Sequence, residues 1–303
     1  MAETQDAQVE RTEAAVSDDG HVISRIVVGV DGSPGSERAL DWAAAEAERN
    51  GAELTIVGAW EYGGFGGDVL TEEEARLVLE RAATSVSDRY PAVSVQHQLR
   101  REPASFSLIE ASLGADLLVV GSRGFGGFRG LLFGSVGQHC LTHAPCSVAI
   151  IRAPDEEVRT SDSETKPHRI VAGVDGSHGS NLALDWAARE AFRMGAQLDV
   201  VGSWVFPGSS GYVFAADVGV PEAARQVVHD ALAYVATVAP QVVVQATTSE
   251  DPPAVALVDA SRRADLLVVG SRGLGAFRGL LLGSVSHHLA THAHCSVVVV
   301  RGR

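Results

Sequence analysis

The sequence predicts an α/β fold in two tandem copies, each built on a parallel sheet with helices on both faces. Short apolar runs alternate with segments of helical periodicity along most of the chain. Two stretches recur almost unchanged: RIVVGVD (25–31) returns as RIVAGVD (169–175), and ADLLVVGSRG (115–124) returns at 264–273. At 303 residues the length favours about two domains. Together these observations indicate one domain duplicated in tandem.

The first strand is expected at 25–31, where a continuous apolar run ends in a carboxylate. A helix is expected over about 35–50, because Ser33 is a candidate N-cap, Pro34 suits the first turn and Asn50-Gly51 suits the end. The helix is predicted to bury a face of residues at helical spacing: Ala39, Leu40, Trp42, Ala43 and Ala47.

The other elements of the first half follow the same alternation. They are expected as a second strand at 53–60, a glycine-rich loop at 63–68, an amphipathic helix at 69–90 before Pro91, a third strand at 93–99, a helix at 103–113, a fourth strand at 116–120 and a fifth strand at 147–151. The second half repeats this order. Asp175 follows Asp31 by 144 residues and Gly270 follows Gly121 by 149, so the second half has a net insertion, assigned mostly to the loop at 207–221.

Composition separates the two domains from two polar segments. Residues 1–22 are acidic and poor in apolar side chains, which predicts a disordered tail, and 153–168 are predicted to form a linker. The domains are therefore expected at 23–152 and 169–303. The formal net charge of −14 argues against a nucleic-acid partner, no apolar run is long enough for a membrane span, and the three cysteines lack a disulfide framework. We therefore expect a cytoplasmic protein without a membrane partner.

A glycine-rich stretch follows the fourth strand of each half and predicts a phosphate site. It reads GSRGFGGFRGLLFGSV at 121–136 and GSRGLGAFRGLLLGSV at 270–285. Glycines let backbone N–H groups approach an anion without a Cβ in the way. The Gly134-Ser135 and Gly283-Ser284 pairs open helix-like segments, whose N-termini would add free N–H donors and partial positive charge. The two serines could donate to a phosphate, ligate a metal or cap the helix.

Charged residues near this stretch extend the predicted site. In an open parallel sheet ligands bind beyond the carboxyl ends of the strands, so Asp31 and Gly121, like Asp175 and Gly270, face one crevice if strands one and four are neighbours. The aspartates could bind a ribose hydroxyl or a metal, or be turn residues only. The loop arginines could contact phosphates or stay solvated: Arg123, Arg129, Arg272 and Arg278.

The two halves differ at one position beside the predicted phosphate site. Ser286 stands where the first half has Gly137. We hypothesise that its hydroxyl is available to a terminal phosphate, which would make the second half bind a triphosphate more tightly.

Several other chemistries lack support in the sequence. The P-loop pattern and its lysine are absent, which disfavours a fast NTPase, and the glycines follow the fourth strand rather than the first, which disfavours a dinucleotide fingerprint. No Ser-His-Asp or Cys-His constellation recurs in both halves, so no catalytic residue is assigned. Zinc is not expected, on the interpretation that these residues share no ligand spacing between the halves: His139, Cys140, His143, Cys146, His287, His288, His292, His294 and Cys295.

The chain resembles the universal stress proteins in their tandem two-domain form. The resemblance covers about 25–152 and 169–301, and it rests on the signature G-2x-G-9x-G-[S/T], met by Gly121, Gly124, Gly134 and Ser135 and again by Gly270, Gly273, Gly283 and Ser284. Members with this signature form the ATP-binding branch. The resemblance implies two Rossmann-like (adenine nucleotide alpha hydrolase-like) domains, each a five-stranded parallel sheet in order 3-2-1-4-5. It also implies an internal pseudo-dimer of the two halves through strand five, and it is compatible with a homodimer and with an unidentified protein partner.

The resemblance further implies one adenine-nucleotide site in each half. Asp31 and Asp175 would meet the ribose, and Ala59 and Ser203 would lie near the adenine. ATP with Mg²⁺ or Mn²⁺ is the implied cofactor, with Ser135 and Ser284 as ligands of the metal. The full set of expected ATP-binding residues is Gly29, Val30, Asp31, Ala59, Val120, Gly121, Arg123, Gly124, Gly134, Ser135 and Val136, and Gly173, Val174, Asp175, Ser203, Val269, Gly270, Arg272, Gly273, Gly283, Ser284, Val285 and Ser286.

The sequence leaves the use of the nucleotide open. One reading is a nucleotide-dependent regulator in a stress or growth-arrest response, in which occupancy orders the glycine-rich stretch. A second is a slow Mg²⁺-dependent ATP hydrolase, and a third is a sensor of another adenine nucleotide such as cyclic AMP, which would need no metal. A protein-interaction scaffold with vestigial sites is the alternative without nucleotide. No general base decides among them.

Overall fold

The computed structural model describes residues 23–61, 71–124, 133–153, 168–204, 222–274 and 281–302. Several expectations lie outside these residues. They concern the tail at 1–22, the loops at 63–68 and 207–221, nearly all of the linker at 153–168, and the positions of Arg129 and Arg278.

Strands and helices alternate through both halves. The first half consists of β1 (Arg25–Val30), α1 (Pro34–Asn50), β2 (Glu53–Ala59), α2 (Glu72–Arg89), β3 (Val95–Arg100), α3 (Ala104–Ala111), β4 (Leu117–Gly121), α4 (Ser135–His143) and β5 (Ser147–Ile151). The second half consists of β6 (Arg169–Val174), α5 (His178–Met194), β7 (Gln197–Ser203), α6 (Glu222–Val238), β8 (Val244–Ser249), α7 (Pro253–Ser261), β9 (Leu266–Gly270), α8 (Ser284–His292) and β10 (Ser296–Val300).

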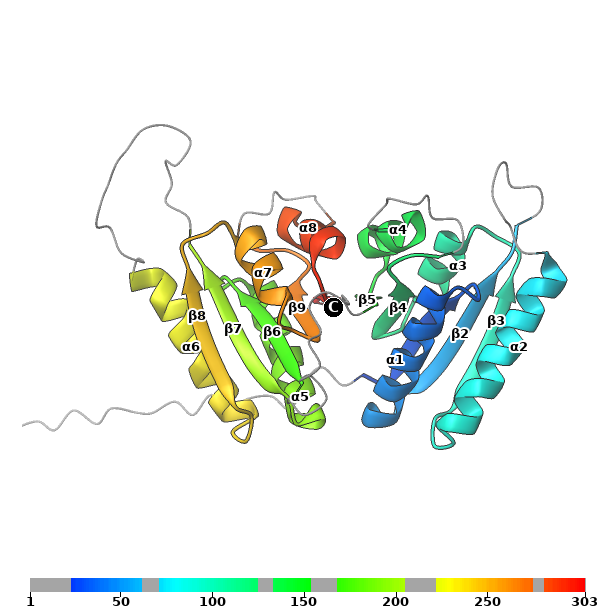
Figure 1. The fold of residues 1–303 in the computed structure, drawn as a ribbon, viewed down its shortest axis with the longest axis horizontal. Coiled ribbons are helices and arrows are strands. Elements are labelled where there is room, and N and C mark those ends of the chain that lie inside the picture. The colour runs from blue at the N-terminus through cyan, green and yellow to red at the C-terminus, as the bar shows by residue number, and fades with distance from the viewer. Residues whose placement is uncertain are drawn as a thin grey trace, which may run out of the picture.

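The strands form one ten-stranded sheet in the order β3-β2-β1-β4-β5-β10-β9-β6-β7-β8. Each half therefore has the expected order 3-2-1-4-5, with all neighbours inside a half parallel. The halves join at the centre, where β5 and β10 pair antiparallel, with Ala149 opposite Val298. Figure 1 shows the two halves side by side about this junction. The fifth strand of each half thus has a sheet neighbour on both sides.

Local sequence explains where the helices begin and end. Ser33 and Ser177 cap α1 and α5, each accepting a hydrogen bond from the backbone N–H three residues later. Gly51 and Gly195 end these helices in the left-handed region, with φ of 63° and 60°. Thr71 starts α2 through a capping box with a glutamate three residues on.

Some boundaries differ from those expected. The helix predicted at 69–90 begins at Glu72, because the capping box fixes its start. The third strand begins at Val95 rather than at 93, because the N–H of Val93 closes a turn onto the Tyr90 carbonyl. The predicted buried face of α1 is correct except that Trp42 is only half-buried, whereas its counterpart Trp186 is 2% exposed.

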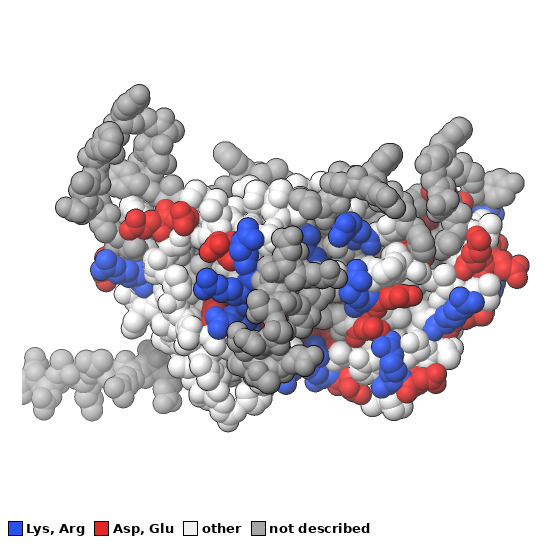
Figure 2. All heavy atoms as spheres, in the orientation of Figure 1, with Lys and Arg blue, Asp and Glu red and all other residues white. Residues whose placement is uncertain are grey.

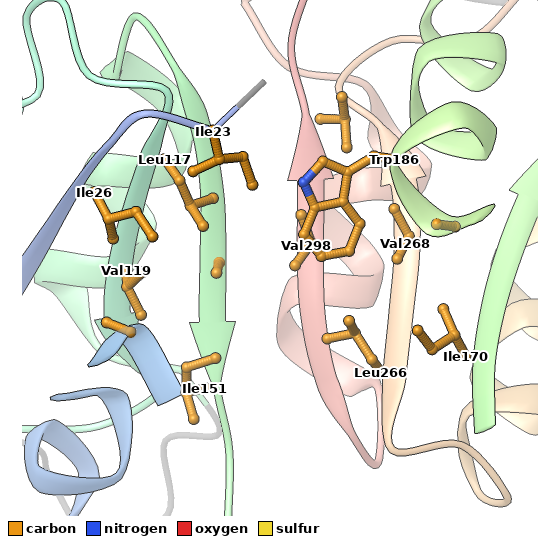
Figure 3. Close-up of a cluster of buried hydrophobic side chains, with 14 of the residues drawn as sticks. Ile23, Ile26, Leu117, Val119, Ile151, Ile170, Trp186, Leu266, Val268 and Val298 are labelled. Atoms are coloured by element: carbon orange, nitrogen blue, oxygen red, sulfur yellow. The ribbon is translucent and has the colours of Figure 1, made fainter. Parts of the chain in front are cut away.

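The sheet has a hydrophobic core on each face. One core lies under α1, α2, α5 and α6 and contains residues of both halves, among them Ile26 and Val119 of the first and Trp186 and Val298 of the second (Figure 3). The other core lies under α3, α4, α7 and α8. Both cores continue across the β5–β10 junction, so burial of apolar surface holds the two halves together.

Two arginines cross the junction in a pseudo-symmetric pair. The Arg152 backbone N–H donates to the hydroxyl of Ser296 over 3.2 Å, and its guanidinium donates to the Ala290 carbonyl near the end of α8. Arg301 does the same in reverse, from its backbone N–H to the Ser147 hydroxyl and from its guanidinium to carbonyls at the end of α4. A cation is favourable there, because helix C-termini carry partial negative charge.

The described surface has mixed charge on the face shown in Figure 2, where basic and acidic side chains lie interspersed over both halves. Among the helices of the described residues, none combines the length and the apolar character that a membrane span requires.

Candidate functional site

A cavity lies in each half where the carboxyl ends of the parallel strands meet the glycine-rich stretch. The first cavity measures about 420 Å³ and the second about 590 Å³, within the range of about 300–1,000 Å³ usual for small-molecule sites. The structure brings every residue of the expected ATP-binding set to these two cavities, while Arg129 and Arg278 lie outside the described residues. The first is lined by Gly29, Val30, Asp31, Ala59, Val120, Gly121, Arg123, Gly124, Gly134, Ser135 and Val136, and the second by Gly173, Val174, Asp175, Ser203, Val269, Gly270, Arg272, Gly273, Gly283, Ser284, Val285 and Ser286.

Close backbone packing requires the first glycine of each stretch. A Cβ on Gly121 would lie 2.7 Å from the carbonyl carbon of Gly35, and a Cβ on Gly35 would lie 2.2 Å from the Arg123 carbonyl oxygen. The same contacts recur between Gly270 and Gly179. These glycines therefore let the end of β4 or β9 approach the first turn of α1 or α5, a reason that differs from the anion approach predicted for them.

The second glycine of each stretch lies against the aspartate that ends the first strand. A Cβ on Gly124 would lie 2.3 Å from a carboxylate oxygen of Asp31, and Gly273 stands in the same relation to Asp175. The predicted crevice between the first strand and the glycine stretch is therefore present, with the aspartate and the glycine backbone in contact across it.

The carboxylate of Asp175 holds two backbone segments together. It accepts hydrogen bonds of 2.9 Å from the N–H of Ser177, at the start of α5, and from the N–H of Leu274, in the glycine stretch. Burial alone would raise the pKa of this carboxyl, but hydrogen bonds involving Ser177, Leu274 and Ser180 outweigh it and hold the pKa below its usual value. Asp31 accepts the corresponding bond from the Ser33 N–H over 2.9 Å. Both aspartates are therefore turn residues that also face a cavity.

The helices α4 and α8 point their N-termini at the cavities. Their N-cap residues are Gly134 and Gly283, and no described side chain caps either helix. Of the three roles considered for Ser135 and Ser284, helix capping is excluded: these serines are the first helical residues, and their side chains are exposed. The N–H groups of the two cap glycines are also not free, because they donate to Ser122 and Ser271 carbonyls over 2.9 and 2.7 Å. The donors that remain are the N–H groups of the first helical turn.

The hypothesis of a tighter second site through Ser286 is not supported. Its hydroxyl donates to the Gly270 carbonyl over 2.7 Å, so its proton is already engaged within the protein. The first half has glycine here because a Cβ on Gly137 would lie 2.7 Å from the Phe133 ring. In the second half Leu282 takes the place of that ring. The two halves therefore differ together at two positions: Gly137 lies against Phe133 in the first half, and Ser286 and Leu282 replace these two residues in the second.

The remaining side chains at the cavities are two arginines, a serine and an apolar wall. Arg123 and Arg272 line the cavities and are exposed, and the Ser203 hydroxyl donates to the Asp251 carbonyl. Val57 and Leu108 form an apolar wall of the first cavity that was not expected from the sequence. Its counterpart consists of Val201 and Leu257. The repeated pattern of apolar residues was visible, but nothing in it distinguishes a cavity wall from an ordinary core.

The interpretation that the histidines share no spacing between the halves is wrong. His139 and His143 occupy the same positions on α4 as His288 and His292 occupy on α8. The cysteines behave as small buried residues, and burial raises the pKa of Cys140 to about 12 and that of Cys146 to about 11. Within the described ranges, no three His, Cys, Asp or Glu side chains converge as a metal site would need.

Comparison with known proteins identifies the family. The profile of the universal stress protein family matches residues 23–152 and 167–301. A universal stress protein of Mycolicibacterium smegmatis is 34% identical over 290 residues, which cover 92% of this chain and 97% of that protein, and universal stress protein Rv2623 of Mycobacterium tuberculosis is 33% identical over 288 residues, 91% and 96% of the two chains. The crystal structure of a universal stress protein from Archaeoglobus fulgidus shares the fold, with a TM-score of 0.65 at 18% identity over 91% of this chain and 98% of that one. The chain therefore belongs to the universal stress protein family and carries two tandem copies of its domain.

Proposed function

We propose that this protein binds one adenine nucleotide, ATP, in each half and acts as a nucleotide-dependent regulator in a stress or growth-arrest response. The observation that carries the proposal is the repeated cavity, in which an uncapped helix N-terminus, an aspartate at the end of the first strand and an apolar wall surround one space. Each of these three features suits a different part of a nucleotide.

The parts of the nucleotide can be assigned by chemistry. The wall of Val57 and Leu108 suits the flat apolar faces of adenine. Asp31 can accept hydrogen bonds from ribose hydroxyls, because a carboxylate is an acceptor only. The first turn of α4 suits the phosphates, since its N–H groups and partial positive charge favour an anion. The second half repeats this arrangement.

A divalent metal would bind with the phosphates. The exposed hydroxyls of Ser135 and Ser284 lie at the helix N-termini, where they could ligate Mg²⁺ or Mn²⁺ beside the phosphate oxygens. The metal would supply charge neutralisation of the phosphates. The oxygen donors fit a hard cation that keeps most of its water ligands.

The test is to denature freshly purified protein and to identify and count the released nucleotide by chromatography and mass spectrometry. We expect about two ATP molecules per chain. No adenine nucleotide, together with no uptake after ATP and Mg²⁺ are added, would remove the proposal and favour the scaffold.

Replacing the strand-end aspartate should empty one site. In Asp175→Ala the hydrogen bonds that join the start of α5 to the glycine stretch are lost, together with the proposed ribose acceptor. We expect the nucleotide count to fall from about two to about one per chain. Asp259→Ala is the control, because its side chain is 84% exposed on α7. A full count in Asp175→Ala would contradict the assignment of this carboxylate.

The metal distinguishes ATP from a nucleotide without a terminal phosphate chain. In the double variant Ser135→Ala and Ser284→Ala, we expect ATP affinity to fall about tenfold or more when Mg²⁺ is present, the scale of a lost charge-assisted interaction. Isothermal titration with ATP and with cyclic AMP, each with and without Mg²⁺, measures this. Tighter binding of cyclic AMP, unaffected by the substitutions or by Mg²⁺, would favour the sensor of another nucleotide. A separate assay of ADP formation tests the slow hydrolase. ADP that accumulates in proportion to the protein concentration and is no longer formed by Gly121→Asp would favour that alternative.

A further inference from the structure

Two pairs of histidines repeat at the same spacing on α4 and α8. His139 and His143 lie four residues apart on α4, and His288 and His292 lie four residues apart on α8. Side chains at this spacing lie on one face of a helix and one turn apart. The ring centroids are 4.5 Å apart in the first pair and 4.3 Å apart in the second. Each pair therefore brings two imidazoles together on one helix.

All four side chains are exposed, so they do not contribute to the hydrophobic core. Four of the nine positions differ between the two helices: Ser286, His287, Leu289 and Ala290 replace Gly137, Gln138, Cys140 and Leu141. A serine, a valine and a threonine are shared besides the histidines. The two histidine pairs have the same spacing, and each pair lies the same number of residues after the glycine stretch of its half. A purely structural need does not explain why two exposed histidines are kept on each helix while buried neighbours vary.

We propose that each pair chelates one divalent transition-metal ion, so that the chain holds one ion on α4 and one on α8. Two histidines four residues apart on one helix face are a known way to present two nitrogen ligands to one metal. Imidazole suits Ni²⁺, Zn²⁺ and Cu²⁺ and does not suit Mg²⁺, which prefers oxygen. Since no third His, Cys, Asp or Glu converges on either pair within the described residues, water completes the coordination.

The two proposed ions are separate from the nucleotide. The histidines lie in the middle and at the last position of each helix, whereas only the first turn lines the cavity. They are also distinct from one another, although the helices meet at the junction, where the Gln138 side-chain nitrogen lies 3.2 Å from Nε2 of His287. An ion that ties residues one turn apart would stabilise the helix whose N-terminus faces the cavity.

The test uses the full chain without an affinity tag of histidines, titrated with Ni²⁺ by isothermal calorimetry. Ni²⁺ prefers imidazole and does not oxidise the buried thiols of the cysteines. The variants are His139→Gln, His288→Gln and both together, and each removes one exposed ligand of a pair. His229→Gln is the control, because this exposed histidine on α6 has no histidine partner one turn away.

We expect about two Ni²⁺ ions per wild-type chain, about one in each single variant and about two in the control. The double variant should bind no Ni²⁺ at the histidine pairs. Nucleotide counted after denaturation should be unchanged in all variants, which separates this test from that of the proposed function. Two ions in the double variant, or none in the wild type, would overturn the proposal. One ion that either single substitution abolishes would replace it by an ion shared between the helices.

Discussion

Gly121→Ala is expected to destabilise the protein by about 1–3 kcal/mol and to lower its nucleotide count from about two to about one. The added Cβ would lie 2.7 Å from the Gly35 carbonyl carbon, 2.8 Å from the Gly35 carbonyl oxygen and 3.1 Å from the Ser36 nitrogen. All three atoms belong to backbone in the first turn of α1, so the clash can be relieved only if the helix and the strand separate. Denaturant unfolding and nucleotide counting measure the two effects.

The signature itself supplies the control. A Cβ on Gly134 would meet nothing closer than the Ser122 carbonyl oxygen at 3.5 Å, which is an ordinary contact. The free energy of unfolding of Gly134→Ala should therefore lie within about 1 kcal/mol of the wild-type value. The backbone at this position is already extended, with φ of −78°, so only the preference for the N-cap position changes. Equal stability of Gly121→Ala and Gly134→Ala would show that the contact with Gly35 is not what requires the first glycine.

A buried pair of carboxyl groups at the junction of the halves leads to the second large effect. Glu46 on α1 and Glu190 on α5 are both 0% exposed and occupy equivalent positions in the two halves. Arg49 contacts both carboxylates, at 2.5 Å from Glu46 and 3.2 Å from Glu190, while Arg193 also contacts Glu190 and the Asn50 amide donates to Glu46. Burial and the neighbouring Glu46 raise the pKa of Glu190 to about 7.

Glu190→Gln should make the stability of the protein less dependent on pH between about 5 and 7. A raised pKa means that the folded protein keeps a proton on Glu190 that the unfolded chain releases above the ordinary value of 4.5. In the wild type the free energy of unfolding therefore falls as pH rises through this window, by up to about 1.4 kcal/mol per pH unit from this one group, and the fall levels off above pH 7. Glutamine carries no proton to lose, so this contribution disappears.

Urea unfolding at several pH values between 5 and 8 measures the slope. Glu80→Gln, on the exposed face of α2, is the control and should keep the wild-type slope. Identical slopes in Glu190→Gln and the wild type would mean that Glu190 does not keep a proton in the folded protein above the usual pKa of a glutamate. Such a result would contradict the raised pKa of Glu190 but not the contacts described at the junction.

The sequence alone determined the order of the elements and the glycine and aspartate positions at the cavities, but not their apolar wall. The first strand, the helix capped by Ser33 and the signature from Gly121 to Ser135 are local patterns, and their repetition 144 to 149 residues later made them unambiguous. The expected strand order and the expected ATP-binding residues came from the resemblance to a family whose signature is equally local. Where local chemistry fixes a start or an end, as the capping box does at α2, the boundary depends only on residues a few positions apart.

The tertiary structure alone decided what the same residues contact. Gly121 is required by the backbone of Gly35, the Ser286 hydroxyl is engaged by the Gly270 carbonyl, and Glu46 meets Glu190 from the other half of the chain. Each of these contacts joins residues far apart in sequence, or depends on the direction of a side chain within its turn. Periodicity and composition carry no information on such distances, because they report which face a residue occupies and not which atom lies opposite.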